Sequence, residues 1–260
     1  MDKSKIEKYG DELYEALVNR KAVAPLTDRE ADITIEDAYQ IQQRMIQRRL
    51  DTGETIIGKK IGVTSKVVMD MLKVDQPDFG MMTSGMVFNE GEAIDTSTMI
   101  APRAEAEVAF VLKSDLQGPG VTAADVLRAT ECVVPCFEIV DSRIQDWKIK
   151  IQDTVADNAS CGVLVLGGLR KSPRDIDLAL AGMVLEKNGE VISTSTGAAV
   201  QGSPVNAVAW LANTLGRLGI PLKAGEVILS GSQSPLVPVK AGDSLVCSVG
   251  GLGSTSVRFI

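Results

Sequence analysis

The chain has 260 residues, 45% of them hydrophobic and 23% charged, which is enough to bury a full core as one large domain or as a domain with a smaller appendage. Its net charge of −7 argues against nucleic acid or an anionic membrane as a partner, because both require a basic surface. The sequence contains no histidine, which excludes Ser-His-Asp triads and imidazole metal ligands. Proton transfer must therefore fall to carboxylate, lysine, tyrosine, thiol or metal-bound water.

Two features of the sequence bear on the cellular compartment. The four cysteines lie in apolar surroundings without the paired spacing of a zinc site, so we expect buried free thiols. No apolar stretch approaches the length of a membrane span, and the first residues lack a signal-peptide pattern. We therefore expect a cytoplasmic protein.

Residues 1–54 are expected to form a helical N-terminal region. Ser4 and Glu7 have the spacing of a capping box, and Thr34 with the acidic residues after it opens a second helix. Apolar residues recur at helical spacing after each of these starts. The two helices are expected to pack on the rest of the chain or to cover it as a lid.

Residues 55–63 have the pattern of a β-strand with two adjacent lysines, Lys59 and Lys60. Side-chain alternation sends them to opposite faces, so we expect one to be solvated and the other to point inward. A buried lysine needs a carboxylate partner or a function, whereas a lysine on an exposed edge strand needs neither. Farther on, Asp78 lies in the loop-like segment 76–80, where a plain turn is favoured over a binding role.

The last third of the chain has a pattern that is nearly all β. Asn188 and Gly189 predict a type I′ hairpin turn, and Pro204 marks the first turn of a helix. Short strands joined by Gly and Pro turns complete the chain. The predicted fold class is α+β, with a helical region over residues 1–54 and a curved, mainly antiparallel sheet body over residues 55–260.

Two carboxylates, Glu105 and Glu107, lie at the start of the apolar run within residues 101–112. If this segment is a strand, alternation puts both on one face, with Cα atoms about 7 Å apart. Like charges in one space are unfavourable unless a cation lies between them or the face is open to water. The alternative is a turn of surface helix, in which the two side chains diverge and share no role.

A third carboxylate, Glu138, lies in the apolar run 132–141, which is otherwise fit for a buried strand. An unpaired buried carboxylate is destabilising, so Glu138 needs a partner. Three glutamate oxygens on adjoining strands would suit a hard cation such as Mg²⁺ or Mn²⁺. The polar stretches 141–148 and 153–160 that follow are either long surface loops or functional segments.

Five segments of the sequence form long, specific motifs, at residues 58–65, 102–110, 138–143, 156–160 and 202–212. In these motifs the chain resembles the hydratase/decarboxylase family of catechol meta-cleavage pathways, within the fumarylacetoacetate hydrolase superfamily. The similarity extends over essentially the whole chain. It implies a mixed β-roll core with a catalytic site in residues 55–260.

The resemblance also implies a cofactor, a substrate and roles for particular residues. The implied ligands of a Mg²⁺ or Mn²⁺ ion are Glu105, Glu107 and Glu138. The implied reaction is hydration of a small anionic dienol, 2-hydroxypenta-2,4-dienoate, to 4-hydroxy-2-oxopentanoate in the degradation of aromatic compounds. Lys60 is expected to hold the substrate's negative charge or to shuttle the first proton, and Asp78 to handle the proton of the added water. Ser160 is expected to contact the substrate carboxylate.

Several alternatives stay open beside hydration. Decarboxylation of 4-oxalocrotonate would use the same metal site, but segments 76–80 and 145–154 favour hydration, because the family's decarboxylases have an apolar residue where Asp78 stands. A C–C hydrolase of acylpyruvate type would require a His-Glu pair, which this chain cannot supply. A non-catalytic subunit is the last alternative, since hydratase and decarboxylase associate in such pathways. We expect a homo-oligomer, and the further partner implied by the resemblance is a 4-oxalocrotonate decarboxylase.

Overall fold

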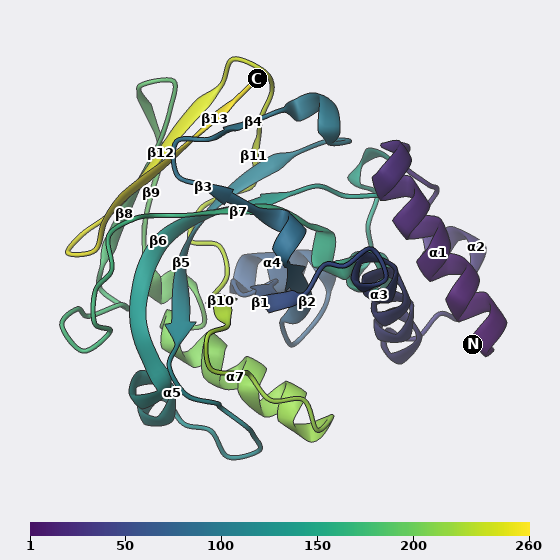
Figure 1. Ribbon diagram of the computed structural model, residues 1–260, viewed down its shortest axis with the longest axis horizontal. Helices are drawn as coiled ribbons and strands as arrows, with labels where there is room; N and C mark the ends of the chain where they lie inside the picture. The colour runs from purple at the N-terminus through teal and green to yellow at the C-terminus, as the bar shows by residue number, and fades with distance from the viewer.

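The computed structural model describes the backbone of residues 1–260 and all side chains except those of Val67, Met71 and Leu72. Two β-sheets form the body of the molecule, with helices on its flanks (Figure 1). The larger sheet contains β1 (Ile56–Gly62), β2 (Asp78–Thr83), β3 (Val87–Asn89), β5 (Arg103–Leu112), β6 (Thr130–Val140), β7 (Cys161–Leu166), β10 (Val227–Leu229) and β11 (Val237–Pro238). The smaller sheet contains β4 (Ala93–Ile94), β8 (Gly182–Lys187), β9 (Glu190–Thr196), β12 (Ser244–Val249) and β13 (Gly253–Phe259).

The strand order confirms the predicted mixed, mainly antiparallel core. The larger sheet runs β2-β1-β10-β5-β6-β7-β3, with β11 also paired to β5, and the smaller runs β4-β13-β12-β8-β9. Strands β1 and β10, β3 and β7, and β4 and β13 pair in parallel, and the other pairs are antiparallel. The predicted hairpin joins β8 to β9, where Asn188 and Gly189 both have positive φ, as a type I′ turn requires.

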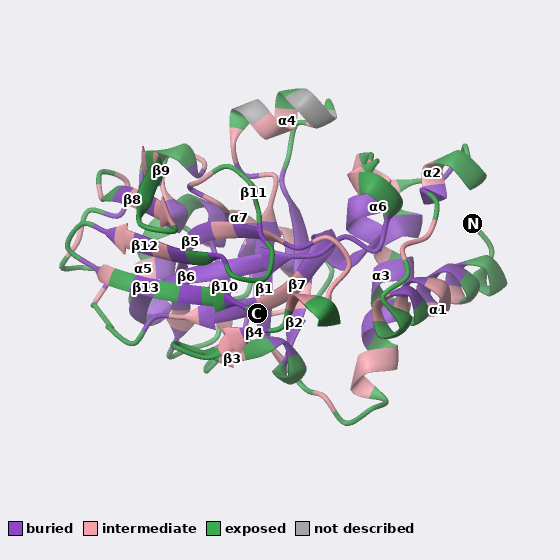
Figure 2. Ribbon diagram, turned by 90° about the horizontal axis from the view of Figure 1, so that it is seen from above, coloured by how far each residue is buried: buried purple, intermediate pink, exposed green. Residues whose placement is uncertain are grey.

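Helices surround this body at one end and along one side (Figure 1). They are α1 (Lys3–Asn19), α2 (Leu26–Arg29), α3 (Ile35–Leu50), α4 (Lys66–Leu72), α5 (Ala123–Ala129), α6 (Ile151–Ala156) and α7 (Pro204–Arg217). Helices α1, α2 and α3 lie together near the N-terminus, with α6 beside them (Figure 2). Within the described part of the chain, no helix has both the length and the apolar character needed to cross a membrane.

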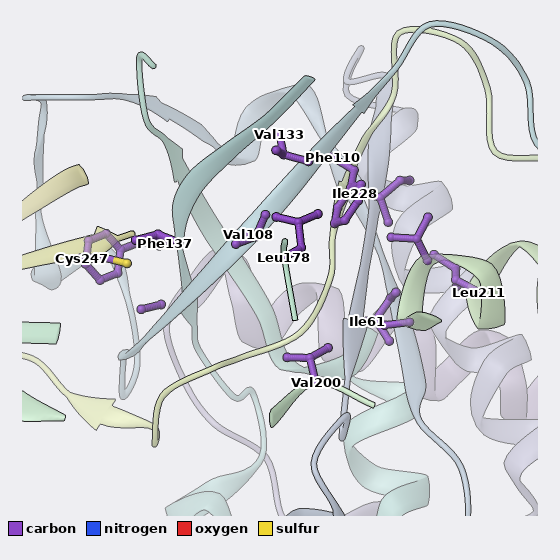
Figure 3. Packing of buried hydrophobic residues seen from close by; sticks show 14 of the residues in the cluster. Ile61, Val108, Phe110, Val133, Phe137, Leu178, Val200, Leu211, Ile228 and Cys247 are labelled. Carbon is purple, nitrogen blue, oxygen red and sulfur yellow. The ribbon is translucent and has the colours of Figure 1, made fainter. Parts of the chain in front are cut away.

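The main hydrophobic core lies between the two sheets and α7. On β5, alternate residues such as Val108 and Phe110 point into it. Phe110 lies opposite Val133 of the neighbouring β6, and Phe137 of β6 lies beside Cys247 (Figure 3). Leu211 of α7 packs against the same cluster. Because alternation assigns the even-numbered side chains of β5 to this core, it sends the odd-numbered ones, glutamates included, to the opposite face.

A second hydrophobic cluster holds the N-terminal helices. It joins side chains of α1, α2 and α3 to three residues from much later in the chain, Ile144, Val155 and Ala156. The side-chain amide of Gln42 reinforces this contact, because it donates hydrogen bonds to the carbonyl oxygens of Phe79 and Val155. The N-terminal helices are thus fixed to the segment before β7, and the predicted division at residues 54 and 55 stays a prediction.

Some local predictions are confirmed and others are wrong. Thr34 caps α3 in a capping box, and all four cysteines are buried free thiols. The first helix, however, is capped by Asp2, whose carboxylate accepts from the backbone of Lys5, and not by Ser4. Asp2 and Ser4 are both acceptable N-cap residues, and the capping-box spacing of Ser4 and Glu7 favoured the wrong one.

Two further predictions are corrected in the core. Lys59 and Lys60 are both buried, because β1 is an inner strand covered on both faces. Asp78 does not lie in a surface turn: it is buried as the first residue of β2. The polar stretch after β6 also differs from a surface loop, since Asp141, Ser160 and several residues between them are buried.

Candidate active site

The register of two neighbouring strands gathers the three glutamates. Strands β5 and β6 are antiparallel, with Glu105 directly opposite Glu138 and Glu107 opposite Cys136. Glu105 and Glu107 share a face of β5 by alternation, and directly opposed residues of a pair point to the same side. One carboxylate oxygen from each glutamate lies within 4.8 Å of the others. The structure therefore brings together the three predicted ligands, and their role as metal ligands stays a prediction.

The carboxylates of this cluster are poorly satisfied by the protein. Glu107 Oε2 accepts a hydrogen bond from the backbone N–H of Gly231 at 2.8 Å. Glu107 Oε1 and both oxygens of Glu138 are buried without a hydrogen bond from any described residue. A buried acceptor that receives no hydrogen bond is strongly destabilising. These carboxylate oxygens are hard ligands, and a divalent cation bound among them would remove that cost.

The electrostatics of the cluster lead to the same conclusion. Burial, with repulsion from Glu138, raises the pKa of Glu105 to about 7 and that of Glu107 well above its ordinary value. Without a cation, these side chains would hold protons near neutral pH. A divalent cation could replace the protons and leave the three carboxylates ionised.

Lys60 points from β1 into this cluster. Its Nζ lies 3.2 Å from Glu138 Oε1, an ion pair that lacks the geometry of a hydrogen bond. Burial by itself lowers the pKa of Lys60, but the carboxylates of Glu138, Glu105 and Asp78 outweigh it, so the net pKa lies above its ordinary value. Lys60 is therefore a buried ammonium ion that faces several carboxylates at once.

Asp78 occupies the same face through the pairing of β1 with β2. It lies opposite Gly62, two residues along β1 from Lys60. A Cβ at position 62 would lie 2.2 Å from Asp78 Oδ1, so only glycine leaves room for the carboxylate. Neither oxygen of Asp78 has a hydrogen-bond partner with good geometry among the described residues. Burial raises the pKa of Asp78 to about 6, against the lowering effect of Lys60.

Ser160 is held by a turn of unusual conformation. Asn158, Ala159 and Ser160 all have φ between 51° and 54°, in the left-handed region that residues with a Cβ rarely adopt. A fully buried ion pair between Arg143 and Asp157 supports the turn, and Arg143 also donates to the carbonyl oxygens of Asp157 and Cys161. The conformation is thus imposed by buried contacts around it.

A cleft of about 430 Å³ connects these groups. Its lining includes Lys60, Asp78, Glu105 and Ser160, together with apolar side chains such as Val140 and Ile149. All the residues predicted to act on substrate therefore face one space, and Glu107 and Glu138 lie buried behind Glu105. A volume of this size is ample for a small organic acid.

Three groups that border this cleft were not predicted from the sequence. Arg103 and Trp147 line it, and their side chains stack. The loop after β10 lines it too, with Ser232 and Ser234, and supplies the N–H of Gly231 to Glu107. Arg103 shares the strand face of Glu105 and could have been found by alternation, whereas the loop reaches Glu107 only through the tertiary fold.

Comparison with known proteins places the chain in a family. Residues 59–260 match the model of the fumarylacetoacetate (FAA) hydrolase C-terminal family. The chain is 59% identical to a 2-hydroxyhexa-2,4-dienoate hydratase of Comamonas testosteroni, over 99% of this chain and 98% of the relative. It is 66% identical to a 2-hydroxypent-2,4-dienoate hydratase of Pseudomonas putida, over 85% of this chain and 100% of the relative.

A solved structure agrees over the whole length. The 4-oxalocrotonate decarboxylase from Pseudomonas putida G7, complexed with magnesium and adipate, superposes with a TM-score of 0.97 at 36% identity, over 100% of this chain and 99% of that one. The agreement includes the N-terminal helices as well as the sheets. On the family match, the two relatives and this structure, the chain belongs to the fumarylacetoacetate hydrolase family.

Proposed function

We propose that this protein is a metal-dependent hydro-lyase that converts 2-hydroxypenta-2,4-dienoate to 4-hydroxy-2-oxopentanoate in the meta-cleavage pathway of aromatic catabolism. The observation that carries the proposal is the meeting of three buried carboxylates, Lys60 and Asp78 at one cleft. The names of the two relatives support hydration of a dienoate. A divalent cation is supported by the magnesium in the related structure, with Mg²⁺ or Mn²⁺ as the proposed ion.

Glu105, Glu107 and Glu138 would hold the ion, since their oxygens converge and lack sufficient donors from the protein. A bound divalent cation supplies Lewis-acid stabilisation of negative charge on the substrate oxygens. Gly231 keeps Glu107 in place through its backbone N–H. The directly opposed pairing on β5 and β6 fixes Glu105 against Glu138.

The reaction needs two proton movements besides the addition of water. In the first step the enol O–H proton leaves and a proton joins C5, which gives an unsaturated ketone. In the second step the water oxygen bonds to C4, and the proton that this water loses ends on C3. Lys60 is the proposed group for the first step, either holding the developing negative charge or shuttling the proton. Its raised pKa favours the first role, because the ammonium keeps its proton.

Asp78 is the proposed group for the added water. With its pKa raised to about 6, it is a stronger base than an ordinary aspartate and still ionises near neutral pH. Its oxygens lack donors among the described residues, so they are available to accept a proton from water. Ser160, whose Oγ lies 3.4 Å from Thr154 Oγ1, is proposed to contact the substrate carboxylate.

The test is an assay of dienol disappearance with the product identified. We expect 4-hydroxy-2-oxopentanoate to form with Mg²⁺ or Mn²⁺, and turnover to stop when the metal is chelated. Asp78→Asn should slow hydration by roughly a hundredfold or more while metal binding persists. A variant that hydrates at the wild-type rate would remove Asp78 from the mechanism.

Decarboxylation of 4-oxalocrotonate is the second candidate, favoured by the close superposition on a decarboxylase. Both reactions pass through charge on the same oxygens, so the metal site alone cannot separate them. Supplying 4-oxalocrotonate and measuring CO₂ does so. Rapid CO₂ release without hydration of the dienoate would replace the first proposal by the second.

The predicted partners and location require separate tests. We propose a homo-oligomer, to be measured by light scattering, and a complex with a 4-oxalocrotonate decarboxylase, to be measured by co-purification of the two proteins. A non-catalytic subunit would bind neither Mg²⁺ nor Mn²⁺ in a calorimetric titration. Cytoplasmic location stays a prediction, to be tested by cell fractionation.

A further inference from the structure

Arg103 occupies a position next to the proposed metal site. It lies on β5 two residues before Glu105, so the two side chains share a face, with Cα atoms about 7 Å apart. Along this face, Glu107 is fully buried, while Glu105 and Arg103 are partly exposed and line the cleft. Arg103 is therefore near the glutamates and within reach of a molecule in the cleft.

Trp147 holds the guanidinium of Arg103 from one side. Arg103 Cζ lies 4.3 Å from the centre of the Trp147 ring, in a cation–π contact. The indole Nε1 donates a hydrogen bond to the carbonyl oxygen of Ala101 at 3.0 Å, which anchors the ring to the segment just before β5. Asp146 and Trp147 both have left-handed φ, 58° and 55°, so the backbone is strained where it presents the ring.

The guanidinium of Arg103 lacks a protein hydrogen-bond partner. Among the described residues, none accepts a hydrogen bond from this side chain, and no carboxylate oxygen lies within 4.0 Å of its guanidinium nitrogens. Arg143, by contrast, is saturated by Asp157 and backbone carbonyls. A partly buried, oriented guanidinium with free donors is typical of an anion-binding group.

The net negative charge of the site explains why a further cation would be needed there. Glu105, Glu107, Glu138 and Asp78 together outweigh the positive charge of Lys60 and a divalent cation. The chain as a whole carries a net charge of −7. An anionic substrate would therefore meet repulsion unless a further cation faced the cleft, and Arg103 is placed to supply it.

We propose that Arg103, oriented by Trp147, is the charged group that binds the substrate carboxylate, which Ser160 is also proposed to contact. The identity of that substrate rests on the proposed function. The planar guanidinium can donate two parallel hydrogen bonds to a carboxylate, which fixes both the charge and the orientation of the ligand. Arg103 is then a substrate-binding residue, and Trp147 is the residue that positions it.

The first experiment measures binding without turnover. Metal-loaded full-length protein is titrated with pyruvate, a small 2-oxo carboxylate, and with its neutral amide, pyruvamide, by calorimetry. The wild-type protein should prefer pyruvate, and Arg103→Met should reduce that preference by roughly tenfold to a hundredfold, since a charge-assisted hydrogen bond is lost. Arg103→Lys, which keeps the charge without the planar fork, should lose less.

A matched control separates the cleft from general electrostatics. Arg258→Met removes an exposed arginine from β13, outside the cleft lining, and changes the net charge by the same amount. It should bind pyruvate as the wild type does. If Arg103→Met fails to fold, as judged by its thermal melt, the comparison is made with Arg103→Lys and Arg103→Gln.

The outcomes are distinct from those that test the proposed function. In the hydration assay, Arg103→Met should raise KM more than it lowers kcat, which a purely structural role would not produce. An unchanged pyruvate preference in the variant, or no preference in the wild type, overturns the assignment even if the protein is a hydratase. Arg103-dependent pyruvate binding in a protein that hydrates no dienoate would keep the assignment and overturn the proposed substrate.

Discussion

Two adjacent lysines on β1 occupy contrasting environments on the two faces of one strand. Lys59 Nζ contacts both carboxylate oxygens of Glu226, and Glu226 also accepts from the backbone N–H of Lys223, so that side is fully satisfied. Lys60 faces Glu138, Glu105 and Asp78, and several of their oxygens have no described donor. Identical residue type and equal burial therefore do not indicate equal roles. We therefore propose a structural role for the Lys59 face and a ligand-binding role for the Lys60 face.

The largest effect is expected when a carboxylate is removed from the Lys60 face of β1. Glu107→Gln keeps the side-chain shape and an acceptor for Gly231, but removes one proposed metal ligand. The Lewis-acid contribution of a metal amounts to several kcal/mol, so turnover should fall roughly a thousandfold or more. The rate is measured at saturating Mg²⁺, with circular dichroism as the check on folding. Wild-type turnover in a folded variant would contradict the metal assignment.

Lys60→Met should produce the next largest effect. It removes the ammonium that faces the cluster, and a single preorganised donor to developing charge is worth about a hundredfold to a thousandfold in rate. Turnover is compared with metal binding measured by calorimetry on the same variant. Loss of rate with metal binding retained assigns Lys60 to the reaction, whereas an unchanged rate would remove it.

Lys59→Met tests the other face of β1, where we expect an effect on stability and not on turnover. The substitution leaves the mostly buried carboxylate of Glu226 without its partner, which should lower the free energy of unfolding by about 3 kcal/mol. Turnover per folded molecule should stay near the wild-type value. Urea denaturation gives the stability, and the double variant Lys59→Met/Glu226→Leu should recover much of it. A Lys59→Met protein as stable as the wild type would show that this pair contributes little.

The smallest expected effect is the pH dependence of the metal-free protein. Because the pKa of Glu105 is raised to about 7 from 4.5, the folded chain binds more protons than the unfolded chain between these values. Stability therefore falls as pH rises through this window, and Glu107, whose pKa is also raised well above its ordinary value, adds to the fall. Thermal melts in EDTA from pH 6 to pH 8 should shift down by a few degrees.

Two controls identify the groups responsible for that shift. Saturating Mg²⁺ should reduce it, because the cation replaces the protons, and Glu107→Gln should reduce it in EDTA, because one of the titrating groups is gone. A melting temperature that rises with pH in EDTA would contradict the raised pKa values of the cluster.

Periodicity made part of the site predictable. Alternation alone put Glu105 and Glu107 on one face, and the apolar run around Glu138 identified a buried carboxylate that needed a partner. The register that sets Glu105 opposite Glu138 depends on how β5 and β6 pair, which local pattern does not determine. The functional roles came from the family resemblance.

Other parts of the molecule were beyond local sequence patterns. Pro77 and Asp78 have turn chemistry, yet pairing with β1 makes Asp78 the first residue of a strand. The exposure expected for one of two adjacent lysines was wrong because β1 is covered on both faces. The buried pair of Arg143 and Asp157 joins residues of a stretch that looked like a surface loop.

Gly62 places a limit on how this enzyme family member can be altered. Any larger residue at position 62 would displace the carboxylate of Asp78, because the new Cβ would lie 2.2 Å from Asp78 Oδ1. A saturation library at this position should therefore return glycine alone among active clones, although glycine brings no chemistry of its own. Substitutions intended to change the substrate should be tolerated better at Ile149 and Leu236. These apolar side chains line the cleft but are not among the proposed catalytic residues.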